Sequence, residues 1–214
     1  MQEMLLPLFP LEVVLLPEEP LPLHIFEERY KTMIGDCLEA KETGQGPADF
    51  GVVLLKGQEL HTLGCTAHIV DVTSKYEDGR MDILTVGKRR FEILETDEER
   101  PYLRGTVEFF DDEGPDSADE AEAAFAIERF REVLRQLRNA SEMPVHLPHP
   151  YHYLSFRLAA ALPLGLEFKQ QLLSLRHEPQ RLKLIVRAMG AILDQLQRTR
   201  QAESKAGGNG NIRH

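Results

Sequence analysis

Cysteine is scarce in this sequence: only Cys37 and Cys65 occur among 214 residues. The two are far apart, and neither belongs to a CxxC or Cys/His spacing of the kind that binds zinc. This excludes the dense disulfide framework of a small secreted domain. A single disulfide stays open, but the pattern indicates a reduced, intracellular protein, and we expect it in the cytoplasm.

Long apolar runs are also absent. No stretch approaches the roughly 18 consecutive apolar residues of a spanning helix. The most apolar segment, residues 5–30 (LLPLFPLEVVLLPEEPLPLHIFEERY), carries five prolines. It has no Lys or Arg before its apolar run and no small-residue cleavage site after it, as a signal peptide would. We therefore expect no membrane contact and take this segment as the first piece of a folded domain.

Positive charge is in short supply, with 25 Lys and Arg against 35 Asp and Glu and a net charge of −10. A nucleic-acid-binding protein normally needs a basic face, so none is expected here. Residues 1–116 hold 25 acidic and 11 basic residues, a net of −14, and residues 117–214 hold 10 and 14, a net of +4. This asymmetry predicts two subdomains of opposite charge. The alternative is that both are ordinary solvated surfaces.

Catalytic motifs are missing as well. A phosphate-binding loop requires GxxxxGK[ST], but at Gly87-Lys88 the first glycine is replaced by Asp82 and the Ser/Thr by Arg89. None of the six serines lies in a GxSxG turn. Ser117 is interpreted as a helix cap, and Ser155 and Ser174 fall within predicted helices. We expect no enzyme, no catalytic residues and no cofactor.

One histidine-rich stretch is the best candidate for a metal site. His146, His149 and His152 lie within seven residues in HLPHPYH, and neutral imidazole is a common zinc ligand. The prolines would have to bend the loop so that the three rings converge, and only Glu142 offers a nearby fourth ligand. We favour a rigid loop that docks one helix on the next, and we predict no metal.

The first half of the chain reads as β-rich with one early helix. Residues 5–16 form an edge-type strand because prolines exclude helix there. A helix then follows with Phe26, Tyr30, Met33, Ile34, Cys37 and Leu38 on one stripe. Strands are predicted at residues 50–55, 64–76, 80–87, 89–96 and 102–112. These strands indicate a small, mostly antiparallel sheet that curls into an open barrel.

The second half reads as helical. An acidic, turn-rich linker at residues 111–120 leads to Ser117 and Glu120, the spacing of a capping box, so a helix should begin there and end at Asn139. Further helices are predicted at residues 151–162, 166–176 and 179–199. The expected fold is α+β, with a β-rich subdomain at residues 1–112, a helical bundle at residues 113–200 and a disordered tail at residues 201–214.

Several stretches, in this order, resemble the N-terminal domain of the Lon protease family: LPLFPLEVVLLPEEPLPLHIFEERYKTMI, FGVVLL, GCTAHIVDV and DGRMDILTVGKRRFEI. The later run LAAALPLGLEFKQQLLSLRHEPQRLKLIVRAMGAIL resembles the helical end of that domain, with Glu167, Lys169 and Gln170 in place and Phe168 inserted. The onset HIFEERY is similar to single-domain bacterial members. The resemblance covers about residues 5–198.

The resemblance implies a PUA-like pseudo-barrel followed by a helical bundle. It also implies a role in recognising protein substrates, which is what this domain does in full-length Lon. The ATPase and the serine–lysine peptidase of Lon lie downstream of it. Our leading hypothesis is a non-catalytic module that binds protein or unfolded polypeptide, within protein quality control. An RNA-binding PUA-like module, resting on Lys88, Arg89 and Arg90, and an autonomous peptidase are the alternatives.

A surface that binds unfolded chains needs exposed apolar groups, because burying them supplies affinity without a fixed sequence. An exposed strand edge would add backbone pairing. The candidate binding residues come from the first strand and from the later hairpin: Leu8, Phe9, Leu11, Val13, Tyr76, Arg80 and Met81. The interpretation competing at each position is a core residue. The identity of the partner and the oligomeric state are left open.

Overall fold

The structure is a computed structural model, and it describes residues 3–114, 117–137 and 151–208, with side chains up to residue 202. Contacts divide the chain into two compact units. Unit 1 comprises Met1–Gly114 and Ala159–Arg176, and unit 2 comprises Pro115–Leu158 and His177–His214. The sequence pattern groups residues 159–176 with the later helices, whereas in the structure these residues belong to the same unit as the β-rich part. The division into subdomains at residues 1–112 and 113–200 stays a prediction.

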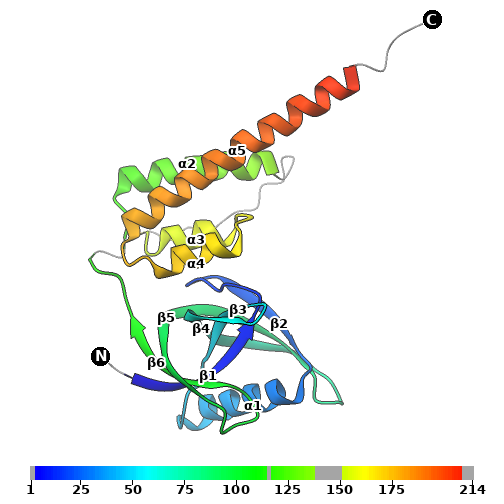
Figure 1. Cartoon of the computed structure of the whole chain (residues 1–214), viewed down its shortest axis with the longest axis vertical. Coiled ribbons are helices and arrows are strands. Elements are labelled where there is room, and N and C mark those ends of the chain that lie inside the picture. The colour runs from blue at the N-terminus through cyan, green and yellow to red at the C-terminus, as the bar shows by residue number, and fades with distance from the viewer. Residues whose placement is uncertain (1–2, 115–116, 138–150, 209–214) are drawn as a thin grey trace, which may run out of the picture. The chain divides into compact units, whose positions relative to one another are not determined.

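Unit 1 is built on six strands that curl into a barrel (Figure 1). They are β1 (Glu3–Leu11), β2 (Pro20–Ile25), β3 (Phe50–Lys56), β4 (Glu59–Lys75), β5 (Met81–Asp97) and β6 (Arg104–Phe110). Their order is β2-β5-β4-β3-β1-β6, and an additional β5–β6 pairing closes the ring. All pairs are antiparallel except β1 with β3. The predicted α+β class with an antiparallel pseudo-barrel is confirmed.

Strand β1 lies inside the sheet, so its prediction as an edge strand was wrong. Residues 3–7 pair with β6 and residues 8–11 pair with β3. Each half of β1 thus pairs mainly with a single neighbouring strand. The missing N–H groups of Pro7 and Pro10 can therefore face the side without a partner strand. Both faces of β1 are covered, since residues 6–9 are all buried. This explains why β1 reads as a continuous apolar run instead of an alternating one.

The barrel interior is filled by side chains from four strands, centred on Phe91. Its neighbours in this core are Leu6, Leu8, Val53 and Val107. A β-carbon added at Gly51 would lie 2.5 Å from Cζ of Phe91, and one added at Gly64 would lie 2.4 Å from the same atom. Glycine at these two positions therefore creates the space that the Phe91 ring occupies.

Helix α1 (Glu28–Thr43) lies against one side of the barrel (Figure 1). Its buried stripe is Tyr30, Met33, Ile34, Cys37 and Ala40, and the Tyr30 ring lies 4.0 Å from that of Phe9 on β1. Phe26 was expected on this stripe, but the helix begins two residues later and the Phe26 side chain is 59% exposed. The apolar spacing continues to residues before the first helical residue, Glu28, where the backbone is not yet helical.

Helix α4 (Leu166–Ser174) is bound to the barrel by polar contacts of three of its side chains. They are the residues at which its sequence resembles the Lon family. Glu167 pairs with Lys56, and Lys169 pairs with Glu19. The Nε2 of Gln170 donates to the Leu63 carbonyl at 3.0 Å. The three polar side chains thus contact three separate strands or loops of unit 1, which is the physical reason why residues 159–176 group with the barrel.

Unit 2 contains α2 (Glu120–Leu137) and α5 (Glu178–Gly208), which pack side by side (Figure 1). Helix α3 (Leu154–Ala160) spans the division between the units. Helix α5 includes residues 201–208, which were assigned to a disordered tail. Extending an existing helix requires no new nucleus, and Ala202, Lys205 and Ala206 favour helix. Residues 209–214 lie outside the described residues.

The cap of α2 differs from the predicted capping box. Oδ1 of Asp119 accepts hydrogen bonds from the N–H groups of Ala121 and Glu122, at 2.9 and 3.4 Å. Ser117 instead forms a β-bridge with His152. Both Ser and Asp are strong capping residues, and the residue directly before the first helical turn is the one that takes the role.

A buried polar cluster joins α3 to α5 within unit 2. Glu178 accepts hydrogen bonds from the Ser155 N–H and hydroxyl at 2.8 and 2.7 Å, and it pairs with Arg181 at 2.7 Å. The exposed fraction of all three residues is 0%. Burial raises the pKa of the Glu178 carboxyl, while Arg181 and Ser155 act in the opposite direction. Ser155 is thus part of the core and is closed to any substrate.

Candidate functional site

Exposed apolar side chains are the feature that a polypeptide-binding surface requires. The large hydrophobic residues that are exposed among the described residues are Leu5, Phe26, Val70, Tyr76, Leu94, Phe125 and Leu137. Phe26 and Tyr76 are brought together because both flank His24. The His24 ring stacks on Phe26 at 5.9 Å and meets Tyr76 edge-on at 6.1 Å. We call His24, Phe26 and Tyr76 the aromatic cluster.

Asp82 holds two members of the aromatic cluster in place. Its Oδ1 lies 2.5 Å from Nδ1 of His24, and its Oδ2 accepts a hydrogen bond from the Tyr76 hydroxyl at 2.7 Å. The hydrogen bonds from His24 and then Tyr76 lower the pKa of Asp82. Conversely, the hydrogen bond to the Asp82 carboxylate raises the pKa of Tyr76. One ionised carboxylate therefore orients two rings, one from β2 and one from the turn that follows β4.

The hairpin beside the aromatic cluster is fixed at its tip. Arg80 donates from Nε to Asp78 at 2.7 Å, and its guanidinium lies 5.2 Å from the centre of the Tyr76 ring. Lys31 on α1 donates to the Asp78 carbonyl at 2.9 Å. The turn is closed by the Gly79 N–H, which donates to the Tyr76 carbonyl, and Gly79 has a φ of 81°. These contacts preorganise an exposed surface on a rigid support.

The open edge of the sheet lies at β2, which pairs only with β5 among the described strands. Backbone hydrogen bonds between Gly87 and residues 18 and 19 fix which residues of β2 direct their N–H and C=O groups toward β5. Residues 20, 22 and 24 are then the non-hydrogen-bonded positions, so their N–H and C=O groups point away from β5. Because Pro20 and Pro22 have no N–H, the free edge offers a single donor, at His24. This edge is a poor template for an added strand.

The structure separates the candidate binding residues into two groups. Leu8 and Phe9 are buried, with 0% and 6% of their surface exposed, while Leu11 and Val13 are half-buried. Tyr76 and Arg80 are exposed, and the half-buried Met81 lies beside them opposite Ile25. Binding through any of the seven stays a prediction, but only the hairpin group presents side chains to solvent next to one another.

Sequence reasoning missed three of the residues in this region: His24, Phe26 and Asp82. The sequence pattern places Phe26 on the buried stripe of the first helix, and it assigns no binding role to His24 or Asp82. The available signal was the alternation of residues 20–25, which the structure shows as exposed and less exposed in turn. Two prolines concealed it, because they argue against a strand unless the strand lies at an edge.

The basic residues considered for RNA are each next to a carboxylate. Lys88 lies 4.0 Å from Glu18, Arg89 lies 3.9 Å from Asp111, and Arg90 pairs with Asp112. The Arg90 and Asp112 side chains are each only 3% exposed. Arg90 also donates to the Leu173 and Leu175 carbonyls, so it anchors the end of α4. This run does not form a continuous basic surface.

The histidine hypothesis can be followed for one residue only. His146 and His149 lie outside the described residues, and His152 bridges Ser117 through its backbone. Within the described residues no group of three or more metal-ligating side chains comes together. Every helix in the described part of the chain is too short or too polar to cross a bilayer.

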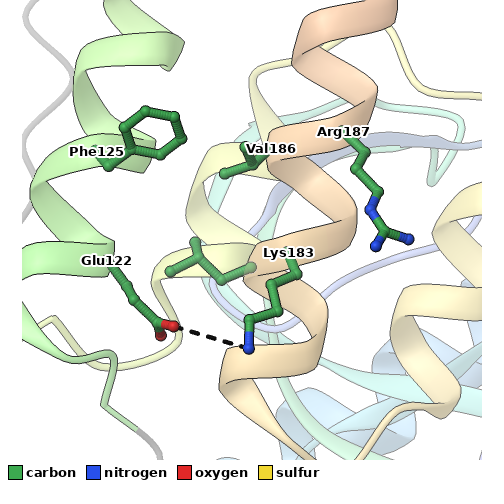
Figure 2. A pocket seen from close by; sticks show the side chains of 6 residues that line it. Glu122, Phe125, Lys183, Val186 and Arg187 are labelled. Carbon is green, nitrogen blue, oxygen red and sulfur yellow. Dashed lines mark ion pairs between the residues drawn. The ribbon is translucent and has the colours of Figure 1, made fainter.

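A second apolar surface lies on unit 2, in a hollow of about 260 Å³ between α2 and α5. Figure 2 shows Phe125 of α2 and Val186 of α5 on the facing sides of the two helices, with the ion pair between Glu122 and Lys183 beside them. Leu182 and Arg187 complete the lining. We call this hollow the α2–α5 groove.

Comparisons with known proteins agree with the resemblance seen in the sequence. The sequence profile of the ATP-dependent protease La (LON) substrate-binding domain matches residues 5–190. A Lon protease from Anaeromyxobacter dehalogenans is 29% identical over 196 residues, which cover 85% of this chain and 22% of that protein. Lon protease 2 from Myxococcus xanthus is 28% identical over 200 residues, covering 85% of this chain and 23% of that protein. The chain thus spans under a quarter of the length of these relatives.

Solved structures show the same fold. The crystal structure of a Lon N-terminal domain protein from Xanthomonas campestris superposes with a TM-score of 0.65 at 26% identity, covering 86% of this chain and 97% of that one. The N-terminal domain of a Mycobacterium avium complex Lon protease superposes with a TM-score of 0.62 at 19% identity, covering 87% and 98%.

Proposed function

Because this chain belongs to the family of LON substrate-binding domains, we propose that it is a non-catalytic module that binds unfolded polypeptide segments. The observation that carries the proposal is the aromatic cluster. Phe26 and Tyr76 are 59% and 43% exposed. Nevertheless, Asp82 hydrogen-bonds the Tyr76 hydroxyl, and the pairing of Arg80 with Asp78 fixes the hairpin tip next to Tyr76. Exposed rings that are already ordered bind apolar side chains with little further loss of conformational entropy.

The partners that suit such a surface are unfolded proteins, as in protein quality control. Apolar burial is not directional and does not depend on one sequence, so a preordered aromatic surface accepts many segments. A cytoplasmic location is part of the proposal, and the two free, buried cysteines support it. The absence of catalysis is supported by the sequence, in which neither a phosphate-binding loop nor a GxSxG turn occurs.

Titration with reduced, alkylated α-lactalbumin, which stays unfolded at neutral pH, tests this proposal. The wild-type chain should bind it, and the Phe26→Ala/Tyr76→Ala variant should bind about tenfold more weakly because two exposed rings are lost. Leu94→Ala is the matched control, since Leu94 is 51% exposed on the same unit. Absence of binding by the wild type, or an equal loss in the control, would contradict the proposal. Casein cleavage that persists through purification would contradict the non-catalytic part.

A further inference from the structure

The α2–α5 groove has a largely apolar lining that includes one exposed aromatic ring. Phe125 is 54% exposed, although its neighbours on the same helix, Ala123 and Ala126, are fully buried. Val186 of α5 extends the apolar lining (Figure 2). Leu182 of α5, which is only 2% exposed, also contributes to it. The hollow of about 260 Å³ is large enough for one or two apolar side chains of a partner. An exposed aromatic ring beside such a hollow is a typical anchor point of an interface.

The charges around the groove are mainly positive. Lys183 and Arg187 line it, and the Arg129 guanidinium lies 5.6 Å from the centre of the Phe125 ring. Glu122 is the one acidic residue of the lining, and it is paired with Lys183 at 3.8 Å. Among the ion pairs of the described residues, none involves Arg129 or Arg187. Arg129 beside the Phe125 ring and Arg187 of the lining thus have no acidic partner among the described residues.

From this arrangement we propose that the α2–α5 groove binds an acidic amphipathic segment of a partner polypeptide. The segment would insert a Leu or Phe side chain against Phe125 and Val186 and place carboxylates near Arg129 and Arg187. Arg binds carboxylates in a two-pronged geometry, and segments rich in Lys or Arg would be repelled. The aromatic cluster of unit 1 differs in this respect, because the Asp82 carboxylate is hydrogen-bonded to two of its rings.

This inference goes beyond the proposed function, since it adds a second surface with its own selectivity. It rests on the proposed function only in taking a polypeptide as the occupant. The aromatic cluster and the α2–α5 groove lie on different units and share no residue, so variants of one leave the other intact.

The test uses three fluorescein-labelled peptides of about 14 residues, long enough to form an amphipathic helix. They carry Leu at the same helical positions and differ only in whether the remaining positions hold Glu, Gln or Lys. In anisotropy titrations with the full chain, the Glu peptide should bind about fivefold more tightly than the Gln peptide, and the Lys peptide most weakly. Equal affinity for the three peptides, or no binding of any, would overturn the proposal.

Two variants locate the binding. Phe125→Ala should weaken binding of the Glu peptide about tenfold, and Arg187→Glu should narrow the preference for the Glu over the Lys peptide about tenfold. Leu94→Ala is the control and should change neither. Because Phe125 and Arg187 are exposed, both variants should fold as the wild type does. If Phe125→Ala is unstable, Arg187→Glu tests the proposal by itself. Unchanged peptide preference in Arg187→Glu would overturn the proposal.

The remaining outcomes separate the two proposals. Groove-dependent binding of the Glu peptide without capture of unfolded α-lactalbumin would support the groove and contradict the proposed function. Capture of α-lactalbumin without discrimination among the peptides would do the reverse. Sedimentation velocity compares the oligomeric state of the wild type with that of the Phe125→Ala variant. A dimeric wild type and a monomeric variant would show that a second copy of the chain occupies the groove, and the proposal would fail.

Discussion

The Nδ1 atom of His24 lies 2.5 Å from Oδ1 of Asp82, although 58 residues separate the two in the chain. The antiparallel register of β2 and β5 places them directly opposite each other. Since Oδ2 of Asp82 also accepts the Tyr76 hydroxyl, a single carboxylate connects three segments. The aromatic cluster is therefore a product of strand pairing, and it depends on the barrel being correctly assembled.

Asp82→Asn should weaken the binding of unfolded polypeptide. The amide keeps one oxygen acceptor where the carboxylate has two, and it loses the charge, so His24 and Tyr76 can no longer both be held as they are. We expect about a threefold loss of affinity for alkylated α-lactalbumin. Asp71→Asn, an exposed carboxylate of β4, is the control and should bind as the wild type does. Equal binding by the two variants would show that Asp82 does not order the surface.

The same carboxylate should make a pH-dependent contribution to stability. His24 and then Tyr76 lower the pKa of Asp82 in the folded protein. The contribution is therefore fully present above the ordinary Asp pKa, about 3.9, and is lost as the pH falls through the lowered folded value. In urea titrations, the difference in midpoint between wild type and Asp82→Asn should be constant from about pH 5 to 7 and shrink below about pH 4. A difference that grows on acidification would contradict this.

Gly64→Ala should destabilise the barrel. The added β-carbon would lie 2.4 Å from Cζ of Phe91 and 2.7 Å from the backbone carbonyl oxygen of Val52. The ring can move only by disturbing a closely packed core, so we expect a loss of about 3 kcal/mol in the free energy of unfolding. Gly35→Ala on α1 is the matched control, since beyond its chain neighbours and its own helix backbone the added β-carbon would have no described atom within 4 Å. It should stabilise by about 0.5–1 kcal/mol.

The capping of α2 distinguishes two residues that the sequence makes nearly equivalent. Asp119→Ala should cost about 1 kcal/mol in unfolding free energy, because the N–H groups of Ala121 and Glu122 lose their acceptor. Ser117→Ala should cost less than about 0.5 kcal/mol, since Ser117 contributes to its bridge through the backbone. Chemical denaturation of both variants measures this. The opposite order would restore Ser117 as the cap.

The sequence was sufficient for the class of fold and for the elements with strong local patterns. Helix α1 follows from the apolar spacing of Tyr30, Met33 and Cys37, and β3 follows from a short apolar run between turns. Strand β2 was missed because Pro20 and Pro22 oppose a strand locally. The edge position that tolerates them is a property of the assembled sheet.

The candidate sites were less accessible to sequence reasoning. Tyr76 and Arg80 were identified from a hairpin pattern, but nothing local indicates that His24 lies opposite Asp82. Leu8 and Phe9 were as apolar as a binding surface requires, and periodicity cannot distinguish covered from uncovered side chains. Likewise, Glu167, Lys169 and Gln170 read as ordinary polar helix residues until their partners Lys56, Glu19 and Leu63 are known.

The buried pair of Glu178 and Arg181 allows the sharpest stability test in unit 2. Both side chains are fully buried, and Glu178 holds Arg181 at 2.7 Å while accepting two hydrogen bonds from Ser155. Glu178→Gln keeps the shape and most hydrogen-bonding capacity, but it removes the negative charge and leaves the guanidinium without this carboxylate. Removing one partner of a buried pair costs about 3 kcal/mol or more, and we expect a loss of that size in the free energy of unfolding.

The double variant Glu178→Gln/Arg181→Met separates the charge pair from the packing. Removing both charges avoids an unpaired buried ion, so the double variant should be less destabilised than the sum of Glu178→Gln and Arg181→Met, with a coupling energy of about 1–3 kcal/mol. Urea unfolding at neutral pH measures all four proteins of this cycle. Additive effects would mean that the two side chains stabilise unit 2 separately, through packing and the Ser155 hydrogen bonds alone.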